Sequence, residues 1–278
     1  SAICEAIRRQ ASQNVETAAR QLALRAGGPM AETHGTRYPI LQGPMTRVSD
    51  TADFALAVAD GGALPFLALA VLRGPQVGKL LDETSGKLGS KPWGVGILGF
   101  VPKELREEQL AEVLRHRPRF ALIAGGRPDQ AQHLEREGIK TFLHVPSPGL
   151  LKMFLRDGAR RVIFEGRECG GHVGPRTSLV LWETMIGVIV DHLQETGDRA
   201  EDYHVVFAGG IHDGRSAAMV AALAAPLSER GVAIGVLLGT SYLFTKESVS
   251  AGAIVQGFQD EALRCQHTIL LESGVGHA

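Results

Sequence analysis

Short apolar runs alternate with amphipathic stretches along most of the chain. Eight runs with few polar residues are typical of strands covered on both faces, and they lie at 38–45, 63–70, 93–100, 120–125, 141–145, 161–165, 204–211 and 232–243. Between them, Ser, Asp or Pro begins and Gly ends several predicted helices, at 51–60, 103–117, 129–137, 150–156 and 178–194. Strands that are each followed by a helix predict an α/β fold, a (β/α)8 TIM barrel, rather than a doubly wound open sheet.

Both ends of the chain depart from this alternation. Residues 3–26 carry apolar side chains at spacings of three and four, which predicts one amphipathic helix packed beneath the barrel. We therefore expect an N-terminal helix and linker over residues 1–30 and a barrel over residues 31–278. Residues 246–264 predict a helix interrupted at Gly252 and Gly257, and residues 267–272 predict an extra strand. This ending is typical of a domain within a longer polypeptide.

Composition and charge exclude several classes of protein. With 44% hydrophobic residues, 34 Gly and 13 Pro, the chain is neither disordered nor collagen-like. A net charge of -1 leaves no basic face for nucleic acid, and no uninterrupted apolar run is long enough to cross a membrane. The three cysteines are widely spaced and suit a reduced cytoplasm better than a structural zinc site. We expect a soluble, cytoplasmic protein.

One glycine motif is excluded by its context. Gly94, Gly96 and Gly99 spell the G-x-G-x-x-G of dinucleotide-binding sites, which follows a strand and opens a helix. Here the glycines lie inside an apolar run, and the next helix begins only after Pro102. The sequence therefore does not predict a Rossmann site.

Glycine clusters mark the carboxyl ends of four predicted strands, on the face where barrels carry their chemistry. They lie at 42–45, 165–174, 208–214 and 239–241. Gly209, Gly210 and Gly239 lead toward helix N-termini, where exposed N–H groups favour an anion. Each cluster taken alone is also typical of a tight turn, but together they indicate a phosphorylated cofactor.

His172 is the candidate acid or base, because glycines at 170, 171 and 174 surround it and an imidazole exchanges protons near neutral pH. Cys169 is an alternative nucleophile that the sequence does not favour. Glu165, Glu168, Cys169 and His172 form no complete ligand set, so no metal is expected. Three other histidines have no distinguishing pattern: His144, His204 and His212.

Four segments resemble the signature of the nitronate monooxygenase (2-nitropropane dioxygenase) family, which also contains flavin-dependent enoyl reductases of fatty-acid and polyketide synthesis. They are YPILQGPM at 38–45, EGRECGGH at 165–172, FAGGI at 207–211 and LGTSY at 238–242. The resemblance covers about 38–245 and implies a TIM barrel that binds FMN without covalent attachment.

The resemblance also implies roles for individual positions. The residues whose main chain would run along the isoalloxazine ring are Gln42, Gly43, Pro44 and Met45. Those that would line the floor near the flavin are Glu165, Gly170 and Gly171. Those that would hold the FMN phosphate are Gly209, Gly210, Gly239 and Thr240. His172 would be the catalytic histidine, and Glu165 departs from the Gln that the family often has at its position.

Three functions are compatible with these residues. The favoured one is an FMN-dependent enoyl-thioester reductase that uses NAD(P)H and takes a small or carrier-bound acyl substrate, as one domain of a multidomain synthase. The first alternative is a nitronate monooxygenase in which His172 acts as base and O2 completes the reaction. The second is a barrel without turnover that serves as a scaffold in an assembly.

Overall fold

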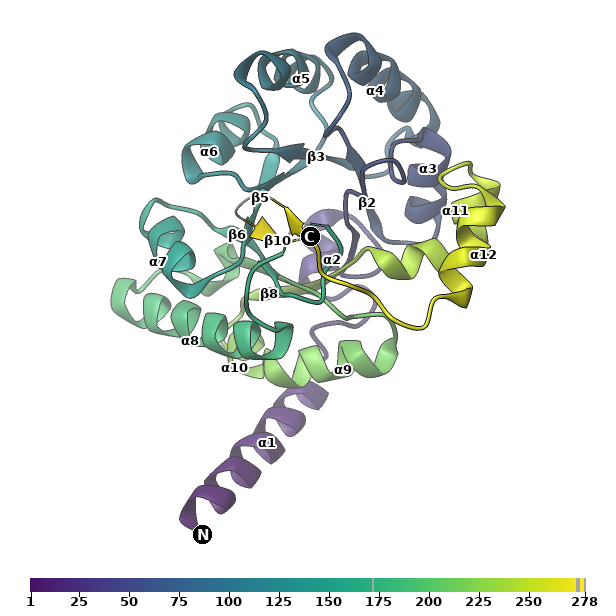
Figure 1. The fold of residues 1–278 in the computed structure, drawn as a ribbon. Helices are drawn as coiled ribbons and strands as arrows, with labels where there is room; N and C mark the ends of the chain where they lie inside the picture. The colour runs from purple at the N-terminus through teal and green to yellow at the C-terminus, as the bar shows by residue number, and fades with distance from the viewer. Residues whose placement is uncertain (172, 274–275, 278) are drawn as a thin grey trace.

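Eight parallel strands close into a barrel in the computed structural model, which describes residues 1–171, 173–273 and 276–277 (Figure 1). The strands follow one another around the barrel in sequence order, and β1 pairs with both β2 and β8. They are β1 (Ile40–Gln42), β2 (Leu64–Ala68), β3 (Gly94–Leu98), β4 (Phe120–Ala124), β5 (Lys140–Val145), β6 (Arg161–Glu165), β7 (His204–Ala208) and β8 (Ala233–Leu238). The predicted TIM barrel is confirmed.

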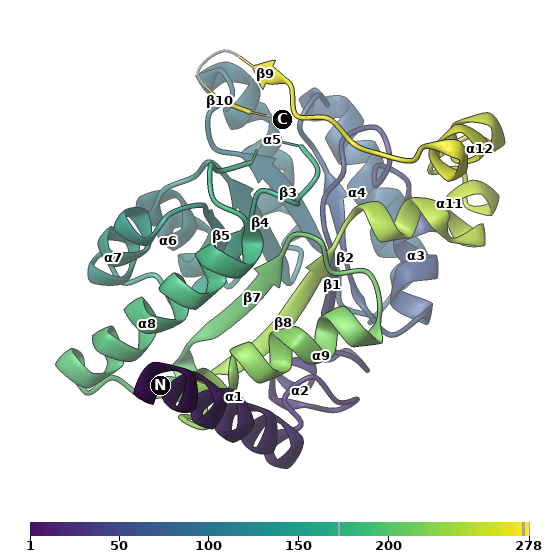
Figure 2. The same ribbon diagram turned by 60° about the horizontal axis from the view of Figure 1, so that its bottom comes forward.

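Most of the helices pack around the outside of this barrel (Figures 1 and 2). They are α1 (Ala2–Gln21), α2 (Pro29–His34), α3 (Ala52–Asp60), α4 (Gly74–Leu88), α5 (Lys103–His116), α6 (Pro128–Arg136), α7 (Pro148–Arg156), α8 (Ser178–Thr196), α9 (Gly214–Leu223), α10 (Ala225–Ser228), α11 (Lys246–Ser250) and α12 (Gln256–Arg264), with 3-10 turns η1 (Ala200–Asp202) and η2 (Thr240–Phe244). Side-chain caps begin α3 at Thr51 and α7 at Ser147. None of the described helices is long and apolar enough to cross a membrane.

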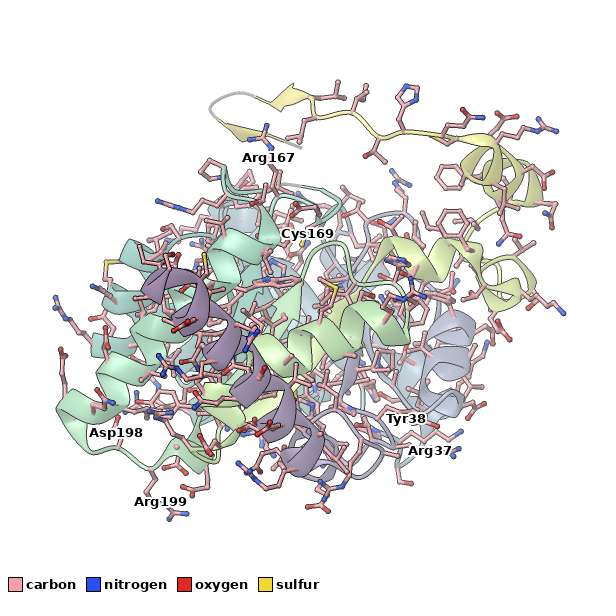
Figure 3. All side chains as sticks on the ribbon, turned by 90° about the horizontal axis from the view of Figure 1, so that it is seen from below. Arg37, Tyr38, Arg167, Cys169, Asp198 and Arg199 are labelled. Carbon is pink, nitrogen blue, oxygen red and sulfur yellow. The ribbon has the colours of Figure 1, made fainter. Side chains whose placement is uncertain are left out.

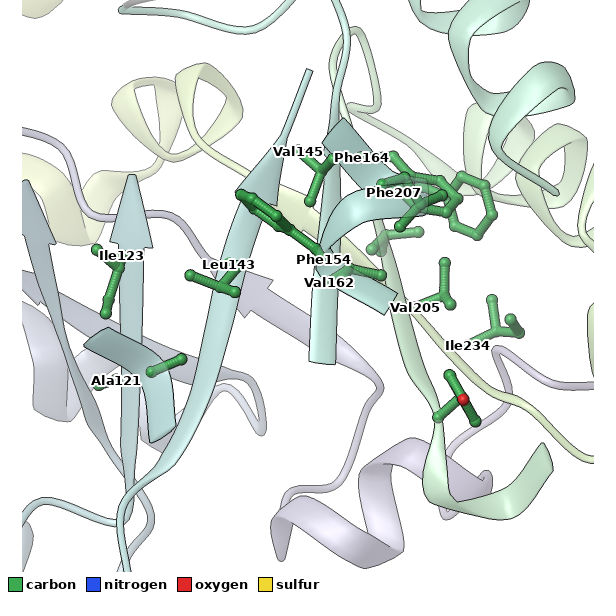
Figure 4. Close-up of a cluster of buried hydrophobic side chains, with 14 of the residues drawn as sticks. Ala121, Ile123, Leu143, Val145, Phe154, Val162, Phe164, Val205, Phe207 and Ile234 are labelled. Atoms are coloured by element: carbon green, nitrogen blue, oxygen red, sulfur yellow. The ribbon is translucent and has the colours of Figure 1, made fainter. Parts of the chain in front are cut away.

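Alternate residues of each strand separate two apolar layers. Side chains that fill the barrel interior include Leu122, Phe142, Ile163 and Val206. Their neighbours along the strands pack outward beneath the helices, as Figure 4 shows for Leu143, Val145, Phe164 and Phe207. Because side chains alternate along a strand, every second residue of β5 and β6 faces the interior, up to the carboxyl end of the barrel.

A short helix that the sequence did not predict, α2, closes the amino-terminal end of the barrel. Pro29 occupies its first turn, and Gly35 ends it with φ +73°. Met30 and His34 are buried beneath the strands. Gly235 of β8 makes room for Met30, since a β-carbon at Gly235 would lie 2.2 Å from the Met30 sulfur.

Helix α1 lies outside the barrel and packs against α9 and α10 (Figure 2). Its contact side is polar: Thr17 is buried, and Arg20 pairs with Glu229 at 3.1 Å. The prediction that its apolar stripe packs beneath the barrel is wrong, because polar residues occupy the contact side. Of the six members of that stripe, Ala18 is partly buried and the other five are exposed: Ile3, Ile7, Ala11, Val15 and Leu22.

The end of the chain also differs from the prediction. The helix expected at 246–264 is two helices, α11 and α12, which are separated at Gly252 (φ +71°), whereas Gly257 lies within α12. Residues 265–271 have no regular secondary structure, and β9 (Glu272–Ser273) pairs with β10 (Gly276–His277). The strand predicted at 267–272 is wrong, because this segment crosses the carboxyl-terminal end of the barrel without pairing to the barrel strands (Figure 2).

Candidate active site

Four of the segments singled out by the sequence meet at the carboxyl-terminal end of the barrel. A β-carbon placed on Gly239 would lie 3.7 Å from the sulfur of Met45, which brings the segments after β8 and β1 together. A β-carbon placed on Gly170 would lie 3.6 Å from Oγ1 of Thr240, which adds the segment after β6. The segment after β7 joins them through Gly209, whose β-carbon would lie 3.4 Å from the Cys169 sulfur. Parallel strands bring these distant segments to one face.

The turn after β1 presents its main chain to this face. Gln42 is buried, and its amide donates to the carbonyl of Gly43 and accepts from the N–H of Phe66 at 3.3 Å. The N–H of Gly43 donates to the Leu238 carbonyl at 2.9 Å, and a β-carbon there would lie 2.8 Å from the side chain of Leu237. The polar groups of Gln42 and Gly43 are therefore bonded within the protein, so this turn offers a ligand van der Waals contact rather than free N–H groups.

Unbound N–H groups lie in the turns after β7 and β8. Within the part of the chain that the structure describes, the backbone N–H groups of Gly209, Gly210 and Gly239 donate no hydrogen bond. Gly209 and Gly210 adopt φ +121° and +73°, which side chains rarely allow. Successive N–H groups in such turns form concavities that bind anions.

The N-terminus of the neighbouring helix α9 is already capped. Asp213 accepts a hydrogen bond from the N–H of Ser216 at 2.8 Å, and this bond lowers the pKa of the Asp213 carboxyl. A carboxylate at this helix end competes with any other anion. An anion at this face would therefore meet the N–H groups of the turns rather than those of α9.

The segment after β6 is held against the turn after β7. The carboxylate of Glu168 accepts hydrogen bonds from the N–H of Ser178, at 2.7 Å, and from its hydroxyl. That hydroxyl lies where a side chain on Gly209 would be, since a β-carbon there would be 2.2 Å away. The glycine at 209 thus serves packing as well as the turn.

Cys169 lies in surroundings that disfavour its thiolate form. Figure 3 shows it at the end of the molecule that lies beneath the C-terminal segment, with Tyr38 at the opposite end. Burial raises the pKa of the Cys169 thiol, and the carboxylate of Glu165 raises it further. A thiol that stays protonated is a poor nucleophile, so the structure gives no support to Cys169 in that role.

The predicted catalytic residue His172 lies outside the described residues, and its role stays a prediction. The glycines before it are exposed, and no atom of the described residues beyond its chain neighbours lies within 4 Å of a β-carbon placed on Gly171, which has φ +84°. The described residues therefore leave space beside Gly171.

The structure places His144 at the candidate site, although no pattern in the sequence distinguished it from the other histidines. His144 on β5 faces the barrel interior two residues beyond Phe142, and its Nδ1 lies 3.2 Å from Oε1 of Glu165 on β6. Only the alternation along β5 signals this placement in the sequence. Among the described residues, no group of three His, Cys, Asp or Glu side chains could hold a metal ion.

Exposed apolar side chains surround the same end of the barrel. They come from the segments after β2, β3 and β8 and from the C-terminal segment that crosses the barrel: Val71, Phe100, Phe244, Ile269 and Leu271. Apolar side chains that stay exposed at the ligand-bearing end of a barrel suit contact with an apolar group.

Comparisons with known proteins agree on one family. A model described as nitronate monooxygenase matches residues 105–263, more than half of the chain. A protein of Rhodococcus jostii (strain RHA1) named (3aS,4S,5R,7aS)-5-hydroxy-7a-methyl-1-oxo-octahydro-1H-indene-4-carboxyl-CoA dehydrogenase is 27% identical over 237 residues, which cover 83% of this chain and 60% of that protein. Nitronate monooxygenase npaC of Metarhizium robertsii is 27% identical over 248 residues, which cover 82% of this chain and 64% of that protein. The chain thus spans less than two thirds of these relatives.

Solved structures agree with the sequence comparisons. FabK from Thermotoga maritima superposes with a TM-score of 0.73 at 25% identity, and the match covers 90% of this chain and 72% of that one. The family that the sequence resembles is thereby confirmed, together with the enzyme class that the resemblance implied. The chain belongs to the nitronate monooxygenase family of flavin-dependent oxidoreductases.

Proposed function

We propose that this chain is an FMN-dependent enoyl-thioester reductase that uses NAD(P)H. The observation that carries the proposal is the meeting of four glycine-bearing segments at one end of the barrel, where three N–H groups in the turns after β7 and β8 donate to none of the described residues. These groups fit a phosphate monoester, and the main chain after β1 fits a flat ring beside it.

The residues of the chain would bind and orient the reactants. Gly209, Gly210 and Gly239 would hold the phosphate with their N–H groups, and the hydroxyl of Thr240 would add a fourth donor. When bound, FMN supplies hydride transfer between NAD(P)H and the β-carbon of the enoyl thioester. His172 would deliver the proton to the α-carbon, so that the double bond gains one hydride and one proton while NAD(P)H becomes NAD(P)+.

The thioester substrate is supported by two features. The apolar side chains around the barrel mouth suit an acyl chain or ring, which is larger and less polar than a small nitronate. In addition, the Rhodococcus relative is named for an oxidoreductase reaction on a carboxyl-CoA thioester. A CoA-bound or carrier-bound acyl group is therefore the proposed substrate class.

Nitronate oxidation is the second candidate, because the Metarhizium relative is named a nitronate monooxygenase. In that reaction His172 would remove a proton from the carbon that carries the nitro group, and no NAD(P)H would be consumed. The same phosphate-binding turns serve both reactions, so the reductant and the substrate distinguish them.

An anaerobic absorbance titration tests the proposal. The FMN-loaded protein is titrated with NADPH or NADH while the flavin band is followed, and trans-2-decenoyl-CoA is then added. We expect the band to bleach and to return with the thioester but not with decanoyl-CoA, its saturated control. If the nicotinamides leave the band intact and ethyl nitronate bleaches it, the monooxygenase function replaces this one.

A further inference from the structure

His144 and Glu165 are the last inward-facing residues of β5 and β6. His144 is level with Ile163 in the pairing of β5 with β6, so Glu165 stands one inward-facing step nearer the carboxyl end. The Nδ1 of His144 lies 3.2 Å from Oε1 of Glu165. Glu165 is therefore placed between the imidazole and the mouth of the barrel.

Both side chains are largely withdrawn from solvent. The exposed fractions are 11% for His144 and 16% for Glu165, and both ring nitrogens of His144 are buried without a well-aligned hydrogen bond in the described part of the chain. A buried polar group without a partner costs about 1–3 kcal/mol. Among the described residues, the charged group that lies within 4 Å of the imidazole is the carboxylate of Glu165.

The surroundings leave Glu165 dependent on His144. The inward-facing positions at the ends of β4 and β7 are Ala124 and Ala208, which carry no charge. Cys169 and Glu168 lie on the mouth side, and the influence of both carboxylates on the Cys169 thiol shows their closeness. Among the described residues, no Lys or Arg forms an ion pair with Glu165, and His144 is its cationic partner when protonated.

We propose that His144 is a positioning residue that holds the Glu165 carboxylate at the floor of the flavin site and compensates part of its charge. This inference rests on the proposed function, since it requires FMN above Glu165. The imidazole faces the carboxylate with Nδ1 at 3.2 Å, so a proton on that nitrogen places positive charge beside Oε1. The negative charge that FMN acquires on reduction would then meet a carboxylate whose charge is partly compensated.

The proposal fixes the sign of the effect of each substitution on the flavin potential. His144→Gln leaves an uncompensated carboxylate below the ring, which opposes the added electrons. We expect this variant to bind reduced FMN at least about tenfold more weakly, relative to oxidised FMN, than the wild type does. That ratio corresponds to a midpoint potential about 30 mV more negative for a two-electron couple. The double variant His144→Gln/Glu165→Gln has no such charge, and its potential should return to that of the wild type.

The experiment measures the midpoint potential and the FMN dissociation constant of the wild type, the single variants and the double variant. His204→Gln is the matched control, because His204 is buried on β7 at the opposite end of the barrel, and its potential should be unchanged. His144→Asn replaces His144→Gln if the latter does not fold.

Each outcome decides the inference. A negative shift in the His144 variant that the double variant removes supports it. An unchanged potential in the His144 variant, or a double variant that stays as low as the single one, overturns it and leaves the proposed function intact. A wild-type protein that binds no FMN overturns both.

Discussion

The ring of Pro44 fills the place where Gly96 would carry a side chain. A β-carbon on Gly96 would lie 2.2 Å from the Cβ and 2.4 Å from the Cγ of Pro44. Gly96 is the middle glycine of the sequence that imitates a dinucleotide-binding motif, and it lies within β3. Its absent side chain lets the turn after β1, which we expect to contact the flavin, sit directly on the neighbouring strands.

Substitution of this glycine should therefore weaken both stability and flavin binding. We expect Gly96→Val to push Pro44 outward and to lower the free energy of unfolding by about 1–3 kcal/mol. The FMN dissociation constant should rise in parallel, since the displaced turn carries the main chain expected along the ring. Denaturant unfolding and a fluorescence titration with FMN measure the two effects.

The control for this substitution is Gly187→Ala on the exposed side of α8. In the described part of the chain no atom outside the adjoining helix backbone lies within 4 Å of a β-carbon there, and alanine favours a helix by roughly 0.5–1 kcal/mol over glycine. This variant should be as stable as the wild type or more so, with unchanged FMN affinity. Equal FMN affinity in the Gly96 and Gly187 variants would contradict the role of the Pro44 contact.

Two substitutions of Gly239 distinguish a steric effect on FMN binding from an electrostatic one. Its φ of -118° is open to any residue, and a β-carbon would make an ordinary contact of 3.7 Å with Met45. Gly239→Ala should fold and retain FMN, whereas Gly239→Asp places a like charge beside the phosphate and should weaken FMN binding at least about tenfold. Flavin content after gel filtration measures both, and normal flavin in the Asp variant would place the phosphate elsewhere.

The three cysteines should differ in reactivity. Cys4 and Cys265 are exposed, whereas burial raises the pKa of Cys169. With a thiol reagent at pH 8, the native protein should be modified quickly at Cys4 and Cys265 and at Cys169 only after unfolding. Peptide mass spectrometry at timed intervals identifies the modified residue. Labelling of Cys169 as fast as Cys265 would show that the segment after β6 opens readily in solution.

The buried pair His34 and His204 makes stability depend on pH. Burial lowers the pKa of His204 to about 4, with Arg161 and Lys140 adding to the shift, and burial lowers the pKa of His34 well below 6.5. The unfolded chain takes up protons below about pH 6.5 while the folded chain does not, so stability falls as the pH drops from 6.5 toward 4. His204 alone accounts for about 3 kcal/mol across that range.

Unfolding free energies at pH 7.5 and 5 measure this dependence. His34→Phe removes one proton-binding site while keeping an aromatic ring against Phe120 and Phe142, and it should reduce the difference between the two pH values. The exposed His133 is the control, and His133→Gln should leave the difference unchanged. An unaltered difference in the His34 variant would show that this histidine is not kept neutral by the fold.

The barrel and the face that bears the site were determined by local sequence patterns. Eight apolar runs punctuated by helix signals require parallel strands with helices between them, and parallel strands place all their carboxyl ends on one face. The sequence therefore predicted that the glycine clusters at 42–45, 165–174, 208–214 and 239–241 lie together on this face. Their order and type also carried the family resemblance that the comparisons confirmed.

Only the tertiary structure decided which side chains meet across the barrel. The pairing of His144 with Glu165 depends on the register between β5 and β6, and the contact of Pro44 with Gly96 depends on how three strands pack. The exposed stripe of α1 and the plug formed by α2 likewise follow from surfaces that are far away in the sequence. Periodicity records how a segment is buried, whereas register and packing arise from interactions between segments, which no local pattern contains.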